Sequence, residues 1–219
     1  MILAKRTNRL NSHWLQVCAP LCAMFALTLG IASAQDAATP ASRTKEVPVD
    51  NKDYWNQFRG PHGDGKVIAG NPPIEFSEAK NVRWKTPIHD QGWSSPVVWG
   101  NQIWLTTARE DGKELFAICV DLESGKIVHD IKVFDVADPQ KENPKLNTHA
   151  SPTPVVEEGR VYVHFGAYGT ACLDTQSGKT LWERRDLKCD HRVRAGSSPI
   201  LDGESLFLVF DGVDTQYTL

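Results

Sequence analysis

A short pattern that occurs three times constrains this chain more than any other feature of its sequence. In each copy a proline is followed seven residues later by an apolar–aromatic–apolar triplet, with a glycine between them. The prolines are Pro96, Pro154 and Pro199, and the triplets begin at Ile103, Val161 and Leu206. Copies that recur at roughly 45 to 58 residues indicate a repeat architecture, in which each copy forms a similar structural unit.

A second shared phrase follows the first two triplets. It reads Asp121-Leu-Glu-Ser-Gly125-Lys in one copy and Asp174-Thr-Gln-Ser-Gly178-Lys in the next, where Trp182 closes it. An aspartate can accept hydrogen bonds from the backbone N–H groups just ahead of it, and glycine readily adopts a positive φ. We therefore expect a tight turn at each phrase, and we interpret these five residues as structural.

The chain beyond Gly92 alternates strand signals with turn signals and has no sustained helical period. Residues 205–210 are apolar on both faces of a strand, and such a strand must be covered on both sides. The sequence therefore predicts an all-β fold, a β-propeller of four-stranded antiparallel blades with about three to four blades present. A further short strand is predicted at residues 82–86. The side chains expected to be buried are Ile103, Trp104, Val161, Tyr162, Leu206 and Phe207.

Residues 1–34 have the pattern of a secretory signal peptide. Lys5, Arg6 and Arg9 precede a largely apolar run, and Ala32-Ser-Ala34 has the small-x-small form that signal peptidase cleaves. We expect cleavage after Ala34, a periplasmic or secreted protein, and no membrane span once the signal is removed. An uncleaved anchor is the alternative, although the apolar run is short for a span of about 20 residues. Residues 35–53 are polar and rich in Pro, Ala and Thr, which predicts a disordered linker before the repeats of 54–219.

Charge and cysteine content exclude some functions. Without residues 1–34 the chain has 21 Lys and Arg against 27 Asp and Glu. This acidic balance argues against a nucleic-acid partner, because phosphate binding needs a basic surface. Three cysteines remain, Cys119, Cys172 and Cys189, whose pairing the sequence leaves open. Cys119 and Cys172 each precede a turn-phrase aspartate by two residues, so we expect both to be small buried side chains, and no metal-ligand spacing occurs.

The segments just before the three prolines contain the candidate site residues. Innermost strands line the channel of a propeller, so these segments are expected to lie at one mouth of the channel. Trp93, His149 and Arg194 are candidates there for binding an anionic or carbohydrate-like ligand. The alternative is that the hydroxyl groups of these segments only satisfy backbone groups at strand ends. No residue is predicted to be catalytic, because His149 has no identifiable partner and the chain has no Gly-x-Ser-x-Gly elbow.

The segment from Cys172 to Trp182 resembles the tryptophan-docking repeat of the pyrroloquinoline-quinone (PQQ) type β-propellers, Asp-x-x-Thr-Gly-Lys-x-x-Trp. Ser177 stands where that family usually has threonine, and His129 stands where the earlier copy would have tryptophan. The opening Trp55-Asn-Gln-Phe-Arg-Gly-Pro-His-Gly-Asp-Gly is also similar to the start of exported PQQ-binding-like repeat proteins. The resemblance covers residues 54–219.

This resemblance implies two functions of different classes. Quinoprotein dehydrogenases of the family hold PQQ and calcium and oxidise alcohols or sugars, whereas members of the outer-membrane assembly type are non-catalytic scaffolds. The dehydrogenases carry an adjacent cysteine pair, which this sequence lacks. We expect a non-catalytic scaffold of the periplasm or cell envelope that binds an envelope protein or a small ligand, with the dehydrogenase as the alternative. Because the third copy ends before a turn phrase, we also expect the chain to be the N-terminal part of a longer protein or a truncated product.

Overall fold

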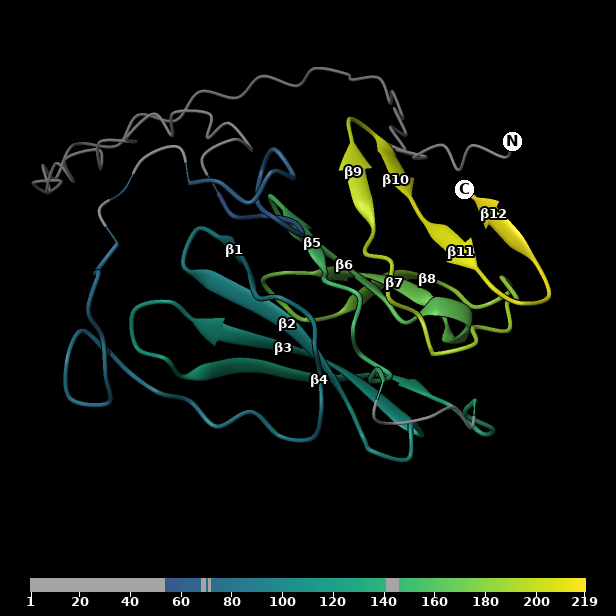
Figure 1. Cartoon of the computed structure of the whole chain (residues 1–219), viewed down its shortest axis with the longest axis horizontal. Coiled ribbons are helices and arrows are strands. Elements are labelled where there is room, and N and C mark those ends of the chain that lie inside the picture. The colour runs from purple at the N-terminus through teal and green to yellow at the C-terminus, as the bar shows by residue number, and fades with distance from the viewer. Residues whose placement is uncertain (1–53, 68–69, 71, 141–145) are drawn as a thin grey trace, which may run out of the picture. The chain divides into compact units, whose positions relative to one another are not determined.

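Two four-stranded antiparallel sheets form the centre of the computed structural model (Figure 1). The structure describes residues 54–67, 70, 72–140 and 146–219, all of which belong to one compact unit. Blade 1 contains, in spatial order, β1 (Val97–Trp99), β2 (Gln102–Ala108), β3 (Glu114–Asp121) and β4 (Ile127–Asp135). Blade 2 contains β5 (Val155–Glu157), β6 (Arg160–His164), β7 (Thr170–Asp174) and β8 (Thr180–Arg184), with the short 3-10 helix η2 (Gly166–Tyr168) between β6 and β7.

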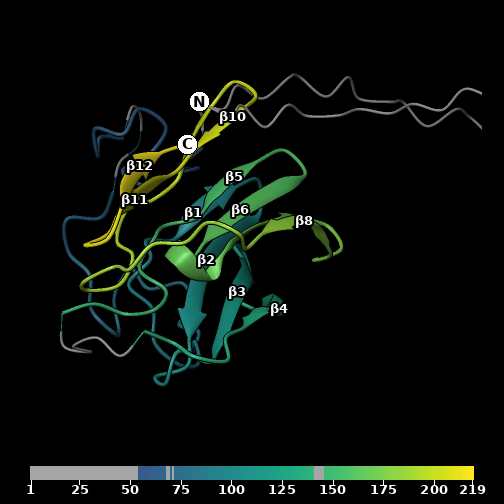
Figure 2. The ribbon, with the colours of Figure 1, turned by 90° about the vertical axis from the view of Figure 1, so that its right-hand side faces the viewer.

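Two two-stranded antiparallel sheets follow the last proline of the repeat, and we call their four strands together the third sheet. Its strands are β9 (Ile200–Asp202), β10 (Ser205–Phe207), β11 (Val209–Asp211) and β12 (Gln216–Thr218). β9 pairs with β10 and β11 pairs with β12, and Leu208 and Leu219 extend the second ladder by two backbone hydrogen bonds of 3.2 and 3.0 Å. Only Leu208 separates β10 from β11, so the second hairpin continues directly from the first (Figure 2). The predicted fold is confirmed: the chain is all-β and forms part of a β-propeller.

The turn phrases fold as tight turns between the third and fourth strands of each blade. In both, the aspartate Oδ1 accepts a hydrogen bond of 2.7 Å from the backbone N–H of the serine three residues later. The pairs are Asp121 with Ser124 and Asp174 with Ser177. The serine hydroxyl and backbone N–H favour the charged carboxylate, so the pKa of each aspartate is lowered. Gly125 and Gly178 follow with φ of 71° in both turns, a conformation that side chains other than glycine rarely adopt.

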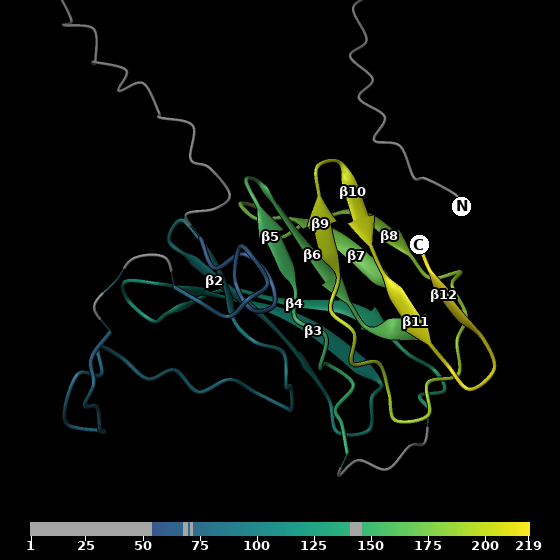
Figure 3. The same ribbon diagram turned by 45° about the horizontal axis from the view of Figure 1, so that its top comes forward.

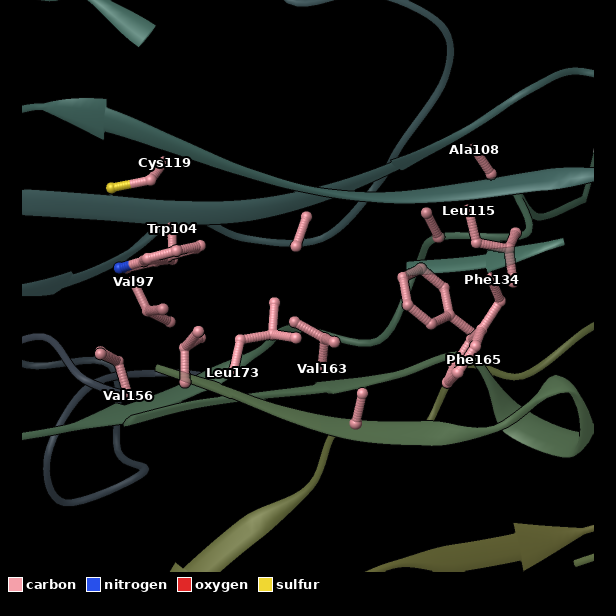
Figure 4. Packing of buried hydrophobic residues seen from close by; sticks show 14 of the residues in the cluster. Val97, Trp104, Ala108, Leu115, Cys119, Phe134, Val156, Val163, Phe165 and Leu173 are labelled. Carbon is pink, nitrogen blue, oxygen red and sulfur yellow. The ribbon is translucent and has the colours of Figure 1, made fainter. Parts of the chain in front are cut away.

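The main hydrophobic core lies between blades 1 and 2 (Figure 4). Trp104 and Phe134 of blade 1 face Leu173 and Phe165 of the blade 2 segment, and all four are at most 2% exposed. Successive residues of a strand point to opposite faces, so Tyr162 and Cys172 lie on the other face of blade 2. That face packs against the third sheet through Leu201 and Leu206, and blade 2 therefore lies between blade 1 and the third sheet (Figure 3).

Three of the six residues predicted to be buried are buried, namely Trp104, Val161 and Tyr162. Ile103 and Leu206 are only half-buried. The prediction for Phe207 was wrong, because its side chain is 40% exposed. Leu206 points toward blade 2, so the next residue along the strand points to the opposite face, which no described element covers.

The predicted strand at residues 82–86 is also absent. This segment has no β-ladder and is held against the first turn phrase by side chains. The predicted signal peptide and linker lie outside the described residues. Within the described part of the chain, no helix has the length and apolar character needed to cross a membrane.

Candidate functional site

The three segments that precede the prolines come together in space. We call residues 92–95, 147–153 and 194–198 the mouth segments. The backbone N–H groups of Trp93 and Ser94 both donate to the carbonyl of Ala150, at 3.0 and 3.1 Å. Asn147 joins the second and third segments, because its Nδ2 donates to the carbonyl of Ala195 at 3.3 Å. The fold thus gathers segments more than forty residues apart in the sequence at one place.

A chain of hydroxyl groups links the mouth segments from one repeat to the next. The backbone N–H of Ser95 donates to Thr153 Oγ1 at 3.0 Å, and the backbone N–H of Thr153 donates to Ser198 Oγ at 3.0 Å. Each of these three residues stands immediately before a proline of the repeat. A Ser-Pro or Thr-Pro pair at the same position of every copy is therefore the sequence pattern that indicates these hydrogen bonds. The hydroxyl groups satisfy backbone donors between neighbouring repeats, which fixes the relative position of the segments.

His149 is the buried member of the predicted site. Its side chain is 5% exposed, and its ring lies 5.7 Å from the ring of Tyr168. Burial and the nearby positive charge of Arg194 lower its pKa to about 4, although Asp111 opposes the shift. The imidazole is therefore neutral at neutral pH, and its Nδ1 is buried without a hydrogen-bond partner.

Arg194 lies beside His149 in an unusual backbone conformation. Its φ is 66°, in the left-handed region that costs a residue with a side chain about 1–2 kcal/mol. Its Nη1 donates to the carbonyl of Asn147 at 2.9 Å, and it forms no ion pair with any residue that the structure describes. A half-buried guanidinium without an acidic partner gives this part of the mouth a positive charge.

Trp93 is the exposed member of the predicted site. Its side chain is 58% exposed, while its backbone is fixed to Ala150 next to His149. The structure therefore brings the backbones of all three predicted residues to the mouth and places His149 near Arg194.

The opening motif of the repeats also lies against the inner strands. The carbonyl of Trp55 accepts from Val98 of β1 at 2.7 Å, and the carbonyl of Asn56 accepts from Val156 of β5 at 2.9 Å. β1 and β5 contact one another and are the first strands of their blades. This two-residue segment therefore bridges blades 1 and 2 at their inner edges.

Sequence reasoning missed a docking tryptophan before the first blade. The Nε1 of Trp84 donates to the carbonyl of Leu122 at 3.0 Å, and the Nε2 of His129 lies 3.2 Å from the carbonyl of Thr175. In both cases the acceptor is the residue directly after the turn-phrase aspartate. Trp84 and His129 therefore occupy equivalent positions, and His129 docks although it replaces tryptophan. Trp182 on β8 is the third such residue; it lies 6.0 Å from the ring of Tyr162 and is 42% exposed.

The cysteines and the possible metal donors are the groups to compare with a PQQ and calcium site. Cys119, Cys172 and Cys189 are buried, and no two of them are adjacent in the sequence. Burial raises the pKa of Cys119 to about 12, so this thiol stays protonated. In the described ranges no three His, Cys, Asp or Glu side chains are grouped so that they could hold a metal ion.

The fold and the docking turns define a β-propeller repeat protein of the tryptophan-docking class. The family described as outer membrane protein assembly factor BamB matches residues 74–215, and the chain belongs to this family. No curated protein matches the chain.

Solved structures are similar to part of this chain at low identity. BamB from Moraxella catarrhalis is 15% identical with a TM-score of 0.43, and the match covers 57% of this chain and 36% of that one. Quinohemoprotein alcohol dehydrogenase from Comamonas testosteroni is 15% identical with a TM-score of 0.39, and the match covers 56% of this chain and 18% of that one. The chain therefore spans well under half of the length of these two proteins.

Proposed function

We propose that this protein is a non-catalytic binding scaffold of the periplasm or cell envelope, which holds a protein partner at its mouth segments. The observation that carries the proposal is the mouth itself. It combines an exposed tryptophan, Trp93, with an arginine that has no ion pair among the described residues, Arg194, on backbones tied together by hydrogen bonds. Tryptophan and arginine dominate the binding energy of protein interfaces, especially where they are held rigidly.

The roles of the repeated residues support a scaffold. The turn-phrase aspartates bind their own backbone, and the residues at the docking position bind the next turn. The most regular part of the sequence is thus used to hold the blades together. Export to the envelope is supported by the leader-like N-terminus and by the family name, outer membrane protein assembly factor.

Photo-crosslinking tests this proposal. A photoreactive phenylalanine is placed at position 93 of the exported protein, and the same residue at position 76 gives the control, since Phe76 is 78% exposed and lies outside the mouth segments. We expect a discrete crosslinked envelope protein from position 93 that Arg194→Gln reduces at least fivefold. Equal crosslinking from positions 93 and 76, or none from position 93, would contradict the proposal.

A PQQ- and calcium-dependent dehydrogenase is the competing function that the family resemblance implies. The test is calorimetric titration of the exported protein with PQQ in the presence of calcium, followed by dye reduction with alcohols and sugars. Under the scaffold proposal we expect neither stoichiometric binding at micromolar quinone nor turnover. Binding together with turnover would replace the scaffold by the dehydrogenase.

A further inference from the structure

Two buried histidines meet at the contact between blade 2 and the third sheet. Phe210 of β11 is 1% exposed and lies between them. The ring of His164 on β6 approaches Phe210 edge-on at 5.4 Å, and the ring of His191 stacks on Phe210 at 6.1 Å. Tyr217 of β12 covers Phe210 as well, with ring centroids 4.8 Å apart. Phe210 thus links the third sheet to blade 2 and to the segment that connects them.

Neither imidazole has an acceptor for a proton on its Nε2 among the described residues. His164 is 1% exposed; its Nδ1 bonds to Thr170 Oγ1 at 2.8 Å, and its Nε2 is buried without a partner. His191 is 2% exposed, and its Nε2 is also buried without a partner. A proton on either Nε2 would be a buried donor with no acceptor and, on a charged ring, a buried charge.

The charged groups around the pair are unevenly placed. On the side of the third sheet, Asp190, Asp211 and Asp214 face His191, and Asp211 Oδ1 lies 3.7 Å from His191 Nδ1. The thiol of Cys189 lies 3.8 Å from the same nitrogen. On the side of blade 2, His164 contacts Thr170, and the charged neighbour that acts on it is His191 itself. Among the residues that the structure describes, no carboxylate therefore offsets a charge on His164.

The direction of both pKa shifts agrees with this geometry. Burial, and then the positive charge of His191, lowers the pKa of His164 to about 3. Burial also lowers the pKa of His191, and the three aspartates only partly oppose it. Both histidines are neutral at neutral pH.

We propose that the contact between blade 2 and the third sheet is an acid-sensitive joint, which is closed at neutral pH and opens when His164 and His191 take up protons. Opening gives each Nε2–H access to water and separates two like charges. Once the joint is open, both imidazoles regain an ordinary pKa near 6.5, so the open form binds more protons than the closed form below that pH. The joint therefore weakens as the pH falls from about 6.5, by about tenfold per pH unit for His164 and by less for His191, whose three aspartates oppose the shift. This device is independent of the binding function proposed above.

Hydrogen exchange on the full chain between pH 7.5 and 5.5, corrected for intrinsic exchange rates, tests the joint. We expect protection in residues 200–219 to fall by about tenfold over this range, while protection in β2 and β3 of blade 1 is retained. The double variant His164→Phe, His191→Phe should make the protection of 200–219 independent of pH. His62→Gln is the matched control, because His62 is exposed, and it should keep the wild-type pH dependence.

Two wild-type results would overturn the proposal without any variant. One is unchanged protection of residues 200–219 down to pH 5.5. The other is loss of protection in blade 1 at the same pH and to the same extent, which would indicate global unfolding. If the double variant folds and still shows the wild-type pH dependence, the histidines are not responsible and the proposal also fails.

Discussion

The interface between blades 1 and 2 and the interface between blade 2 and the third sheet are built by the same repeat but filled differently. The first buries a continuous set of apolar side chains that includes Trp104, Phe134 and Phe165. The second has two smaller apolar clusters, with His164 and His191 buried around Phe210. The turn phrases and prolines therefore determine how the sheets are arranged. The residues between them determine the stability of each interface and its dependence on pH.

The largest expected effect comes from the first interface. Trp104→Ala should lower the free energy of unfolding by about 3–5 kcal/mol, because a fully buried aromatic leaves a cavity. Leu206→Ala in the second interface should cost only about 1–2 kcal/mol, because Leu206 is half-buried. Urea unfolding at pH 7.5 measures both. Equal losses would show that the two interfaces do not differ in strength.

Two glycines differ in whether an added side chain would meet the docking contact between the blades. A Cβ on Gly178 would lie 3.0 Å from Ile131 Cδ1 and 3.1 Å from His129, whereas a Cβ on Gly159 would meet nothing within 4 Å. Both have positive φ, of 71° and 75°, so alanine is strained at either position by about 1 kcal/mol. We expect Gly178→Ala to cost about 2 kcal/mol and Gly159→Ala about 1 kcal/mol, the difference being the docking contact. Thermal unfolding of the two variants would refute this explanation if their losses were the same.

The hydroxyl chain of the mouth provides one link at each interface. Thr153→Val removes the acceptor for Ser95, and Ser198→Ala removes the acceptor for Thr153. Each should cost about 1 kcal/mol, since a backbone N–H between the repeats loses its partner. Both hydrogen bonds measure 3.0 Å, so we expect the two substitutions to lower the free energy of unfolding equally, although the two apolar interfaces differ in strength. Hydrogen exchange at the Ser95 and Thr153 amides checks this, and a rise confined to one of them would contradict it.

The parts of the structure that sequence could predict are those repeated at fixed spacing. The strands of the blades, the turns at Asp121 and Asp174 and the meeting of the mouth segments all follow from the repeat. Trp84 was missed because no turn phrase precedes it, so nothing nearby marks it as a docking residue. His164 and His191 lie 27 residues apart in the sequence, and both contact Phe210. No local sequence pattern predicts this shared contact. Phe207 was wrongly expected to be buried because its triplet lies in a sheet with one uncovered face.

The smallest expected effect is at a histidine that belongs to neither interface. His89 Nδ1 lies 2.7 Å from Asp90 Oδ2, and its Nε2 lies 3.0 Å from Asp130 Oδ1 on β4. Burial opposes the shift, but the two aspartates raise the pKa of His89 above 6.5. The charged imidazole is thus favoured in the folded protein. Its contribution to stability is complete below about pH 6.5 and is lost as the pH rises through the folded pKa, the opposite sign to His164 and His191.

Asp130→Asn tests the contribution of charged His89 to stability. It should lower the free energy of unfolding by about 0.5 kcal/mol or less at pH 6, because a partly exposed ion pair is screened by solvent, and by nothing measurable at pH 8.5. Urea unfolding at the two pH values, with low salt in both, gives the comparison. A loss at pH 8.5 as large as that at pH 6 would show that Asp130 stabilises β4 through something other than the charge on His89. The expected result would show that His89 stabilises the folded protein at low pH, which is the opposite of the effect expected from His164 and His191.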